Sequence, residues 1–122
     1  MTESKFWNFL QKQKSDCPGK IYAVSIQNGD LASSQAGEYL TGHALLPENY
    51  DKISLSEVDE MGKLLFMDNI AAKTKEAVLI LLAHLPNRTA LSILSKYCEN
   101  PDQNLEIFAK MALEECKIWN EA

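Results

Sequence analysis

The side chains best suited to chemistry gather around His43. It lies in a Gly-His-Ala-Leu-Leu-Pro stretch, with Tyr39, Thr41, Glu48 and Tyr50 close by in the sequence. An imidazole beside hydroxyl groups and a carboxylate could act as a general base or help to bind a small ligand. A loop histidine more often packs or hydrogen-bonds within its own fold. We therefore interpret His43 as structural. A small enzyme or ligand-binding protein with a site around His43, Tyr39 and Glu48 stays as the alternative.

A second group of reactive side chains lies in the carboxyl-terminal half: His84, Cys98 and Cys116. They could be imagined as zinc ligands, but zinc sites in small domains usually contain closely spaced ligand pairs, and this sequence has none. Cysteine is one of the most buried residue types, and a histidine at the end of a helix interacts well with the helix dipole. We expect packing roles here, with no metal and no cofactor.

Glu114 and Glu115 look like a solvated helix face rather than a pair of catalytic carboxylates. The chain contains no GxxxxGK[ST], GxGxxG, HExxH or GxSxG motif. These observations predict a protein that is not an enzyme.

Composition indicates one globular domain spanning 1–122. The chain has 122 residues, of which 46% are hydrophobic and 24% charged, enough to bury an ordinary core. A net charge of −5 argues against nucleic-acid binding. No run of apolar residues is long enough for a membrane span, and the first residues lack the pattern of a signal peptide. Three cysteines, none of them in a CxxC motif, suggest a reducing cytoplasm.

The elements that must position these side chains are clearest after residue 73, where three consecutive helices are predicted: Thr74–Leu85, Arg88–Glu99 and Pro101–Asn120. The first is apolar on nearly every side, so it belongs at the centre of the domain, and Thr74 could cap its start. Pro86 ends it. Asn87 can cap the second helix.

Asn100 and Pro101 predict the start of the last helix, because asparagine is a favoured N-cap and proline suits the first helical position. Connections this short force consecutive helices to lie antiparallel. A further helix, Ser56–Phe66, with Ser54 or Ser56 at its start, is predicted before the three.

The apolar positions recur along these helices. Ala77 and Leu81 stand 32 residues before Ala109 and Leu113. With a shift of 33, Val58, Met61, Leu64 and Leu65 fall on Leu91, Leu94, Tyr97 and Cys98. A period in this range is typical of helical solenoids, in which each helix pair buries its apolar face on the next.

On these residues the chain resembles HEAT-like, armadillo-type helical repeats over its carboxyl-terminal half. The segment NRTALSILSKYCENPDQNLEIFAKMALEEC looks like one unit, with an Asn-Pro-Asp turn at 100–102 and small and large core residues at Ala109, Ala112 and Leu113. It departs from the family at Glu106, where a basic residue is common. The resemblance implies a stack of helix pairs that binds other proteins through its surface.

The amino-terminal half is less regular. Thr2–Lys14 is a plausible amphipathic helix, and we favour its docking onto the domain's own core. Trp7 widens its apolar stripe, so that part of the stripe could meet a partner or a second copy of the chain. Ile21–Gln27 suits a short strand or a helix, and we favour helix because no partner strand is evident. Leu31–Leu40 would then be a further helix.

Together these features predict an all-α fold: a short right-handed stack of antiparallel helix pairs, an α-α superhelix of HEAT-like type, with about six helices. Residues 1–50 would form capping helices and a loop, and 54–122 the HEAT-like pairs. We expect a cytoplasmic interaction module or adaptor with a protein partner, without nucleic acid or membrane, and with a homodimer as an alternative. The candidate partner or ligand surface comprises Trp7, Tyr39, His43, Glu48 and Tyr50.

Overall fold

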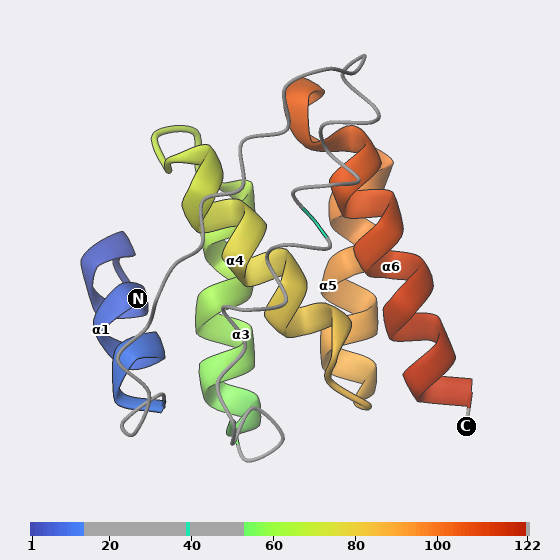
Figure 1. Ribbon diagram of the computed structural model, residues 1–122, viewed down its shortest axis with the longest axis horizontal. Coiled ribbons are helices and arrows are strands. Elements are labelled where there is room, and N and C mark those ends of the chain that lie inside the picture. The colour runs from blue at the N-terminus through green and yellow to red at the C-terminus, as the bar shows by residue number, and fades with distance from the viewer. Residues whose placement is uncertain (14–38, 40–52, 122) are drawn as a thin grey trace.

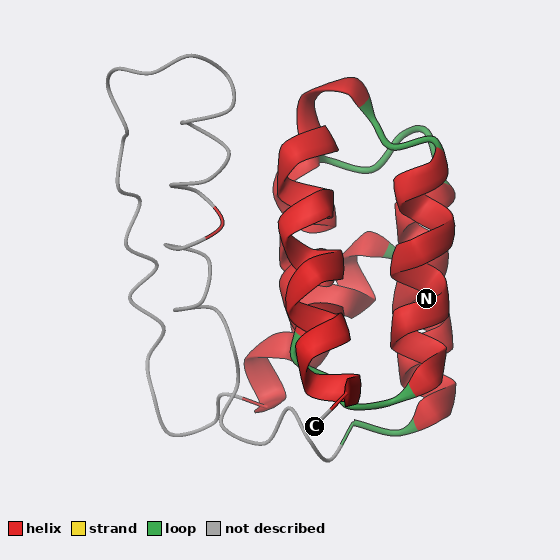
Figure 2. Ribbon diagram, turned by 90° about the vertical axis from the view of Figure 1, so that its right-hand side faces the viewer, coloured by secondary structure: helices red, strands yellow, loops and turns green. Residues whose placement is uncertain are grey.

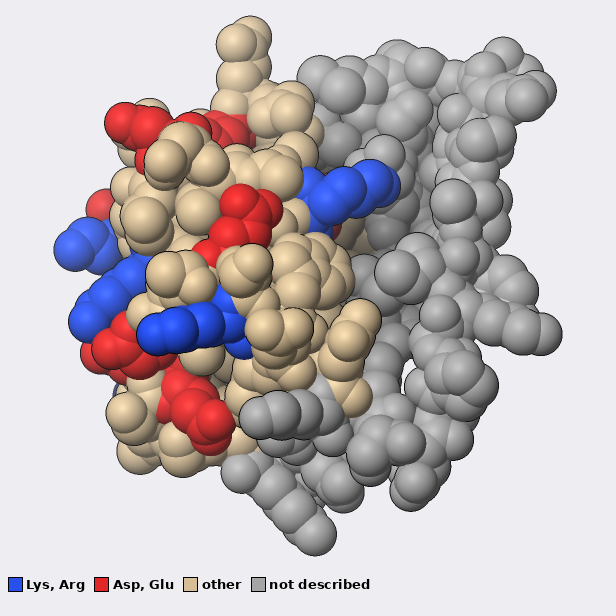
Figure 3. Space-filling model, turned by 90° about the vertical axis from the view of Figure 1, so that its left-hand side faces the viewer, with Lys and Arg blue, Asp and Glu red and all other residues tan. Residues whose placement is uncertain are grey.

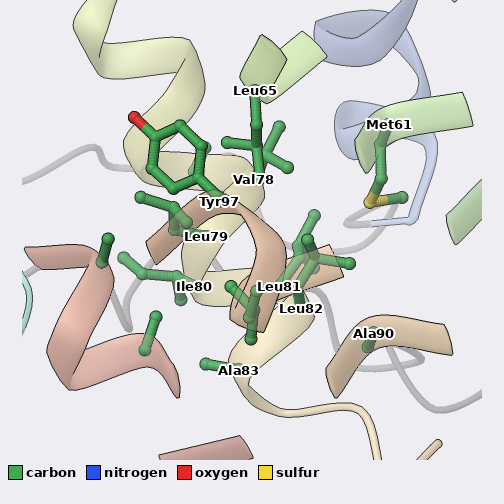
Figure 4. Packing of buried hydrophobic residues seen from close by; sticks show 14 of the residues in the cluster. Met61, Leu65, Val78, Leu79, Ile80, Leu81, Leu82, Ala83, Ala90 and Tyr97 are labelled. Carbon is green, nitrogen blue, oxygen red and sulfur yellow. The ribbon is translucent and has the colours of Figure 1, made fainter. Parts of the chain in front are cut away.

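Helix α4 (Ala72–Ala83) forms the centre of the fold in the computed structural model, which describes residues 1–13, 39 and 53–121. Every residue of α4 from Thr74 to Ala83 is buried. Figure 4 shows the side chains of Val78 to Ala83 pointing to different sides of the helix, each toward other apolar groups. A helix that is apolar on all sides can be stable only where neighbours surround it. The prediction that this segment is central is confirmed.

The other helices form two layers. Helix α3 (Leu55–Lys63), extended by a 3-10 turn at Leu64–Phe66, and helix α5 (Arg88–Glu99) contact each other in one layer. Helix α6 (Glu106–Glu121) contacts α4 in the other layer. Figure 1 shows α3, α4, α5 and α6 running in alternating directions, and Figure 2 shows the two layers joined by loops at their ends. The chain thus forms two antiparallel helix pairs, α3–α4 and α5–α6.

The described residues contain five α-helices and no strand, so the all-α prediction is confirmed in this part of the chain. The first of them is α1 (Glu3–Gln13), close to the predicted Thr2–Lys14. The expected total of about six helices stays a prediction. The segment Ile21–Gln27 lies outside the described residues, as do residues 40–52.

Two predicted helix starts are confirmed by their hydrogen bonds. The Ser54 side chain accepts a hydrogen bond from the Glu57 backbone N–H, and the Glu57 carboxylate accepts one in return from the Ser54 N–H. This reciprocal capping box provides hydrogen bonds for two backbone N–H groups that would otherwise have no partner within α3. At α5, Asn87 Oδ1 accepts from the Ala90 N–H at 2.8 Å. Local sequence suffices at both positions.

Two other predicted starts were wrong. Helix α4 begins at Ala72 with Ala71 as its N-cap, so Thr74 does not cap it and lies within its first turn. Helix α6 begins at Glu106 rather than Pro101, after a 3-10 turn at Gln103–Leu105. Asn100 is instead the C-cap of α5, with an extended φ of −151°. A residue before proline disfavours the helical region, so the chain leaves α5 in a turn before it can start another helix.

The start of α4 is satisfied by α1 instead. The Glu3 carboxylate accepts hydrogen bonds from the Ala71 N–H and from the Thr74 hydroxyl. The indole N–H of Trp7 donates to the same hydroxyl oxygen at 2.9 Å. An acidic group at a helix N-terminus also interacts favourably with the helix dipole. These bonds, with the burial of Phe6, hold α1 against the first helix pair, on the side away from α5 and α6 (Figure 1).

Candidate functional site

A partly buried network of polar side chains joins α4, α6 and Tyr39. His84, the C-cap residue of α4, is 7% exposed. Its Nε2 lies 2.8 Å from Glu115 Oε2 on α6, and its Nδ1 lies 2.8 Å from the carbonyl oxygen of Ile80. The hydroxyl of Tyr39 donates to the other carboxylate oxygen of Glu115. We call these three residues, His84, Glu115 and Tyr39, the histidine network.

Two aromatic rings lie against the histidine network. The ring of Tyr39, itself 4% exposed, meets the ring of Phe108 edge-on, with 5.1 Å between the ring centroids. The indole of Trp119 lies 6.5 Å from the imidazole of His84, centroid to centroid. Such surroundings strengthen hydrogen bonds between the polar groups, and they make an unpaired group costly.

The surroundings of the histidine network raise the pKa values of Tyr39 and Cys116. Burial, the hydrogen bond to Glu115 and the charge of Glu115 raise the pKa of Tyr39 well above its ordinary value. Burial also raises the pKa of the Cys116 thiol to about 11, although a hydrogen bond from Asn120 works in the opposite direction. Both groups therefore stay protonated at neutral pH, which makes Cys116 a poor nucleophile.

A second polar cluster joins the two helix pairs. Lys75 of α4 has a side chain only 5% exposed, and its Nζ lies 2.8 Å from Asp102 Oδ2 in the turn between α5 and α6. The hydroxyl of Tyr97 donates to the same carboxylate, and the Asp102 N–H donates back to that hydroxyl at 3.2 Å. Burial alone would raise the pKa of Asp102, but the hydrogen bonds from Lys75 and Tyr97 outweigh it and hold the pKa below its usual range.

No protein-family model, curated protein or solved structure matches the chain. The function has to be inferred from the geometry.

The structure describes two of the five candidate surface residues. Trp7 is partly buried and donates its indole N–H to Thr74, so it helps to dock α1 on α4. Tyr39 is buried against α6. His43, Glu48 and Tyr50 lie outside the described residues, and the predicted grouping of His43 with Tyr39 and Glu48 stays a prediction.

Sequence reasoning missed the polar residues that matter most here. Glu115 does not belong to a solvated face as expected, since its carboxylate binds His84 and Tyr39; Glu114, 61% exposed, does. The burial of Lys75, inside the apolar segment Thr74–Leu85, was not predicted. The available signal was a lysine inside the segment Thr74–Leu85, which must be buried on nearly every side, because a buried ammonium needs a partner.

The thiols of Cys98 and Cys116 act as hydrogen-bond donors to the backbone. Cys98 Sγ lies 3.4 Å from the carbonyl oxygen of Ala109, and Cys116 Sγ lies 3.7 Å from that of Leu85. Within residues 1–13, 39 and 53–121, no cluster of three or more His, Cys, Asp or Glu side chains could hold a metal ion. Over the same residues, no helix combines the length and the apolar character that crossing a bilayer requires.

Proposed function

We propose that this chain is a small HEAT-like helical module that binds a partner protein and acts as an adaptor rather than as an enzyme. The observation that carries the proposal is the contact between the two helix pairs. Gly62 of α3 lies so close to Ile93 of α5 that a Cβ atom built on it would be 2.7 Å from Ile93 Cδ1. On the opposite layer, Lys75 binds the turn carboxylate Asp102. Repeated helix pairs stacked through such neighbour contacts form solenoids, whose broad surfaces bind proteins.

The contact at Asp102 also bears on the departure from the HEAT-like pattern at Glu106. The cation that meets the turn carboxylate comes from Lys75, in the second helix of the preceding pair. A link between neighbouring units is therefore present without a basic residue at 106. This supports the HEAT-like interpretation of the α3–α4 and α5–α6 pairs.

The chemistry of the described surface favours a protein partner. On the face shown in Figure 3, acidic and basic side chains are interspersed, unlike the basic stripe that follows a nucleic-acid backbone. Near the end of α6, Ile118 and Trp119 expose 66% and 44% of their surface. Exposed apolar and aromatic side chains are favoured at the centres of protein interfaces. We place the partner contact at Ile118 and Trp119 rather than at Trp7.

The experiment is affinity capture of the tagged chain from cells of its source organism, followed by measurement of the dissociation constant with the purified partner. Ile118→Ser should weaken binding about tenfold or more, as expected for an apolar residue central to an interface. Leu55→Ser is the matched control, because Leu55 is an apolar residue on α3 with a similar exposure of 60%. It should bind as tightly as the wild type.

Two results would contradict the proposal. One is a chain that runs as a monomer and captures no protein above the level of an unrelated tagged control. The other is an equal loss of affinity in the Leu55→Ser and Ile118→Ser variants, which would point to general destabilisation rather than to a contact at α6.

A further inference from the structure

One side of helix α3 is a surface on which the second helix pair stacks. Val58, Gly62 and Leu65 follow one another by one turn along this side of the helix. Gly62 approaches the side chain of Ile93 on α5. Val58 and Leu65, on either side of it, are buried. The stripe that these three residues form is therefore covered by the neighbouring pair.

The equivalent side of α5 has less cover. With the shift of 33 residues, the three positions of α3 fall on Leu91, Ser95 and Cys98. Leu91 and Cys98 are only partly buried, and Ser95 is exposed. On α6, Leu113 stands 32 residues after the buried Leu81 of α4, and it too is only partly buried. These positions mark the side on which a third helix pair would stack.

Charged side chains of α6 lie on the same side. Burial raises the pKa of the Cys98 thiol, and the charges of Lys117 and Glu114 act on that pKa in opposite directions. Both charged groups are therefore close to Cys98. Lys110 stands one turn before Leu113, and Lys117 one turn after it, so the three share one stripe of α6. We call the following residues the end face: Leu91, Cys98, Lys110, Leu113, Glu114 and Lys117.

The charges along α6 are complementary to their own reverse order. Glu106, Lys110, Glu114 and Lys117 are all exposed. Two α6 helices that lie antiparallel, with a twofold axis level with Ala112, bring Lys110 opposite Glu114 of the second copy and Glu106 opposite its Lys117. Symmetry makes each of these contacts twice. A slide of about three residues would instead bring Lys110 opposite Lys117, and like charges in contact are costly. The charges therefore favour one register.

The two ends of the stack differ. Helix α1 lies on the side of the first pair that is away from α5 and α6 (Figure 1). Over the described part of the chain, no helix lies against the end face, on the side of α5 and α6 that is turned toward the viewer in Figure 2. Copies that stacked head to tail would need both ends open. Two end faces can meet about a twofold axis instead, and this closes the assembly.

We propose that the end face binds the end face of a second copy of this chain, giving a twofold dimer with its two α6 helices antiparallel. Leu91, Leu113 and Cys98 supply apolar surface, whose burial favours association. Exposed ion pairs add little affinity, but they exclude registers that bring like charges together. The partner contact at Ile118 and Trp119 is a separate proposal, and the dimer does not depend on it.

The test is sedimentation equilibrium of the full chain, which measures the dissociation constant of the dimer. Lys110→Glu brings glutamates together at both symmetric contacts and should raise the dissociation constant about tenfold or more. Glu114→Lys brings lysines together there and should have the same effect. An equimolar mixture of the two variants has opposite charges at both contacts. It should form a heterodimer whose dissociation constant is within about threefold of the wild-type value.

Lys63→Glu is the matched control. Lys63 is an exposed lysine of α3, on the other helix pair, with a glutamate partner on its own helix. Reversal of its charge should leave the dissociation constant of the dimer unchanged. Urea unfolding of each variant shows whether it is folded, and the mass of the wild-type chain tests the dimer even if a variant does not fold.

Three results would overturn the dimer. They are a wild-type chain that is monomeric at about 100 μM, single variants that dimerise as tightly as the wild type, and a mixture that associates no better than either variant alone. A monomer that still binds a protein through Ile118 would overturn the dimer and leave the proposed function in place. A dimer that captures no other protein would do the reverse.

Discussion

At the scale of single residues, Lys75 and Asp102 show how a buried charge is tolerated. An ammonium withdrawn from water is costly unless a carboxylate meets it. Asp102 provides that carboxylate from a turn and receives a second hydrogen bond from Tyr97. This ion pair links the α3–α4 helix pair to the turn between α5 and α6.

Replacement of this carboxylate should be destabilising at neutral pH. Asp102→Asn removes the charge that offsets the burial of Lys75, and we expect a loss of about 1–2 kcal/mol, reduced from the value for a fully buried pair because Asp102 is 42% exposed. The free energy of unfolding in urea at pH 7 measures it. Asp59→Asn, at an exposed position of α3, is the control and should change stability by less than about 0.5 kcal/mol.

The Asp102→Asn variant should also change how the free energy of unfolding depends on pH in the acidic range. The pKa of Asp102 is held below its ordinary value by Lys75 and Tyr97, against the effect of burial. A lowered pKa contributes stability that is present above the unfolded-state value of about 3.9 and is lost as the pH falls through the lower folded-state value. The stability gap between wild type and Asp102→Asn should therefore close below about pH 4. A gap that stays constant from pH 7 to pH 3 would contradict this account.

At the scale of elements, the contact of α3 with α5 depends on the absence of a side chain at Gly62. Alanine there would gain about 1 kcal/mol of helix propensity, but its Cβ would lie 2.7 Å from Ile93 Cδ1. The end of the isoleucine side chain can rotate away, so the two effects should nearly cancel. Rotation of Ile93 does not make enough room for a larger side chain at position 62.

We therefore expect Gly62→Ala to be close to neutral and Gly62→Leu to cost about 1–3 kcal/mol, the usual range for overpacking. Thermal unfolding of the purified variants measures both. The control is Ser95→Leu, because Ser95 stands 33 residues after Gly62, at the equivalent place in the second pair, and is exposed. If Ser95→Leu is as destabilising as Gly62→Leu, the close approach of α3 and α5 is not the cause.

Helix α1 depends on a different kind of contact, because Glu3 supplies the hydrogen bonds that the start of α4 lacks. Glu3→Ala should cost about 1–2 kcal/mol, similar to the loss of a helix cap. In a Trp119→Phe background, the emission of Trp7 should shift toward that of solvent-exposed indole as its bond to Thr74 weakens. Ser4→Ala, at the next and exposed position, should leave the emission unchanged.

At the scale of the whole molecule, the burial of α4 by its neighbours predicts graded stability. Amide groups of α4 should exchange with solvent only through global unfolding, since Val78 to Ala83 are buried on all sides. Helix α1 is held by Phe6, Leu10 and the Glu3 contacts, so it should open at a lower free energy. Hydrogen exchange followed by NMR or mass spectrometry tests this order. Equal protection of α1 and α4 would mean that α1 belongs to the same cooperative unit.

The sequence by itself determined the helices whose signals are local. The apolar run after Thr74 predicted a central helix, and Ser54 and Asn87 predicted two helix starts, because a cap and a hydrophobic period need only neighbouring residues. Spacing along the chain also suggested helix pairs, which the alternating directions of α3 to α6 match (Figure 1).

Tertiary structure decided the polar contacts. Glu3 at the start of α4, Lys75 with Asp102, and Glu115 with His84 all join residues at least 27 positions apart. Periodicity reports which face of a helix is buried, but it does not report which polar group on another helix will lie opposite. For this reason Glu115 looked like part of a solvated face, and only the packing of α6 on α4 brought it to His84 and Tyr39.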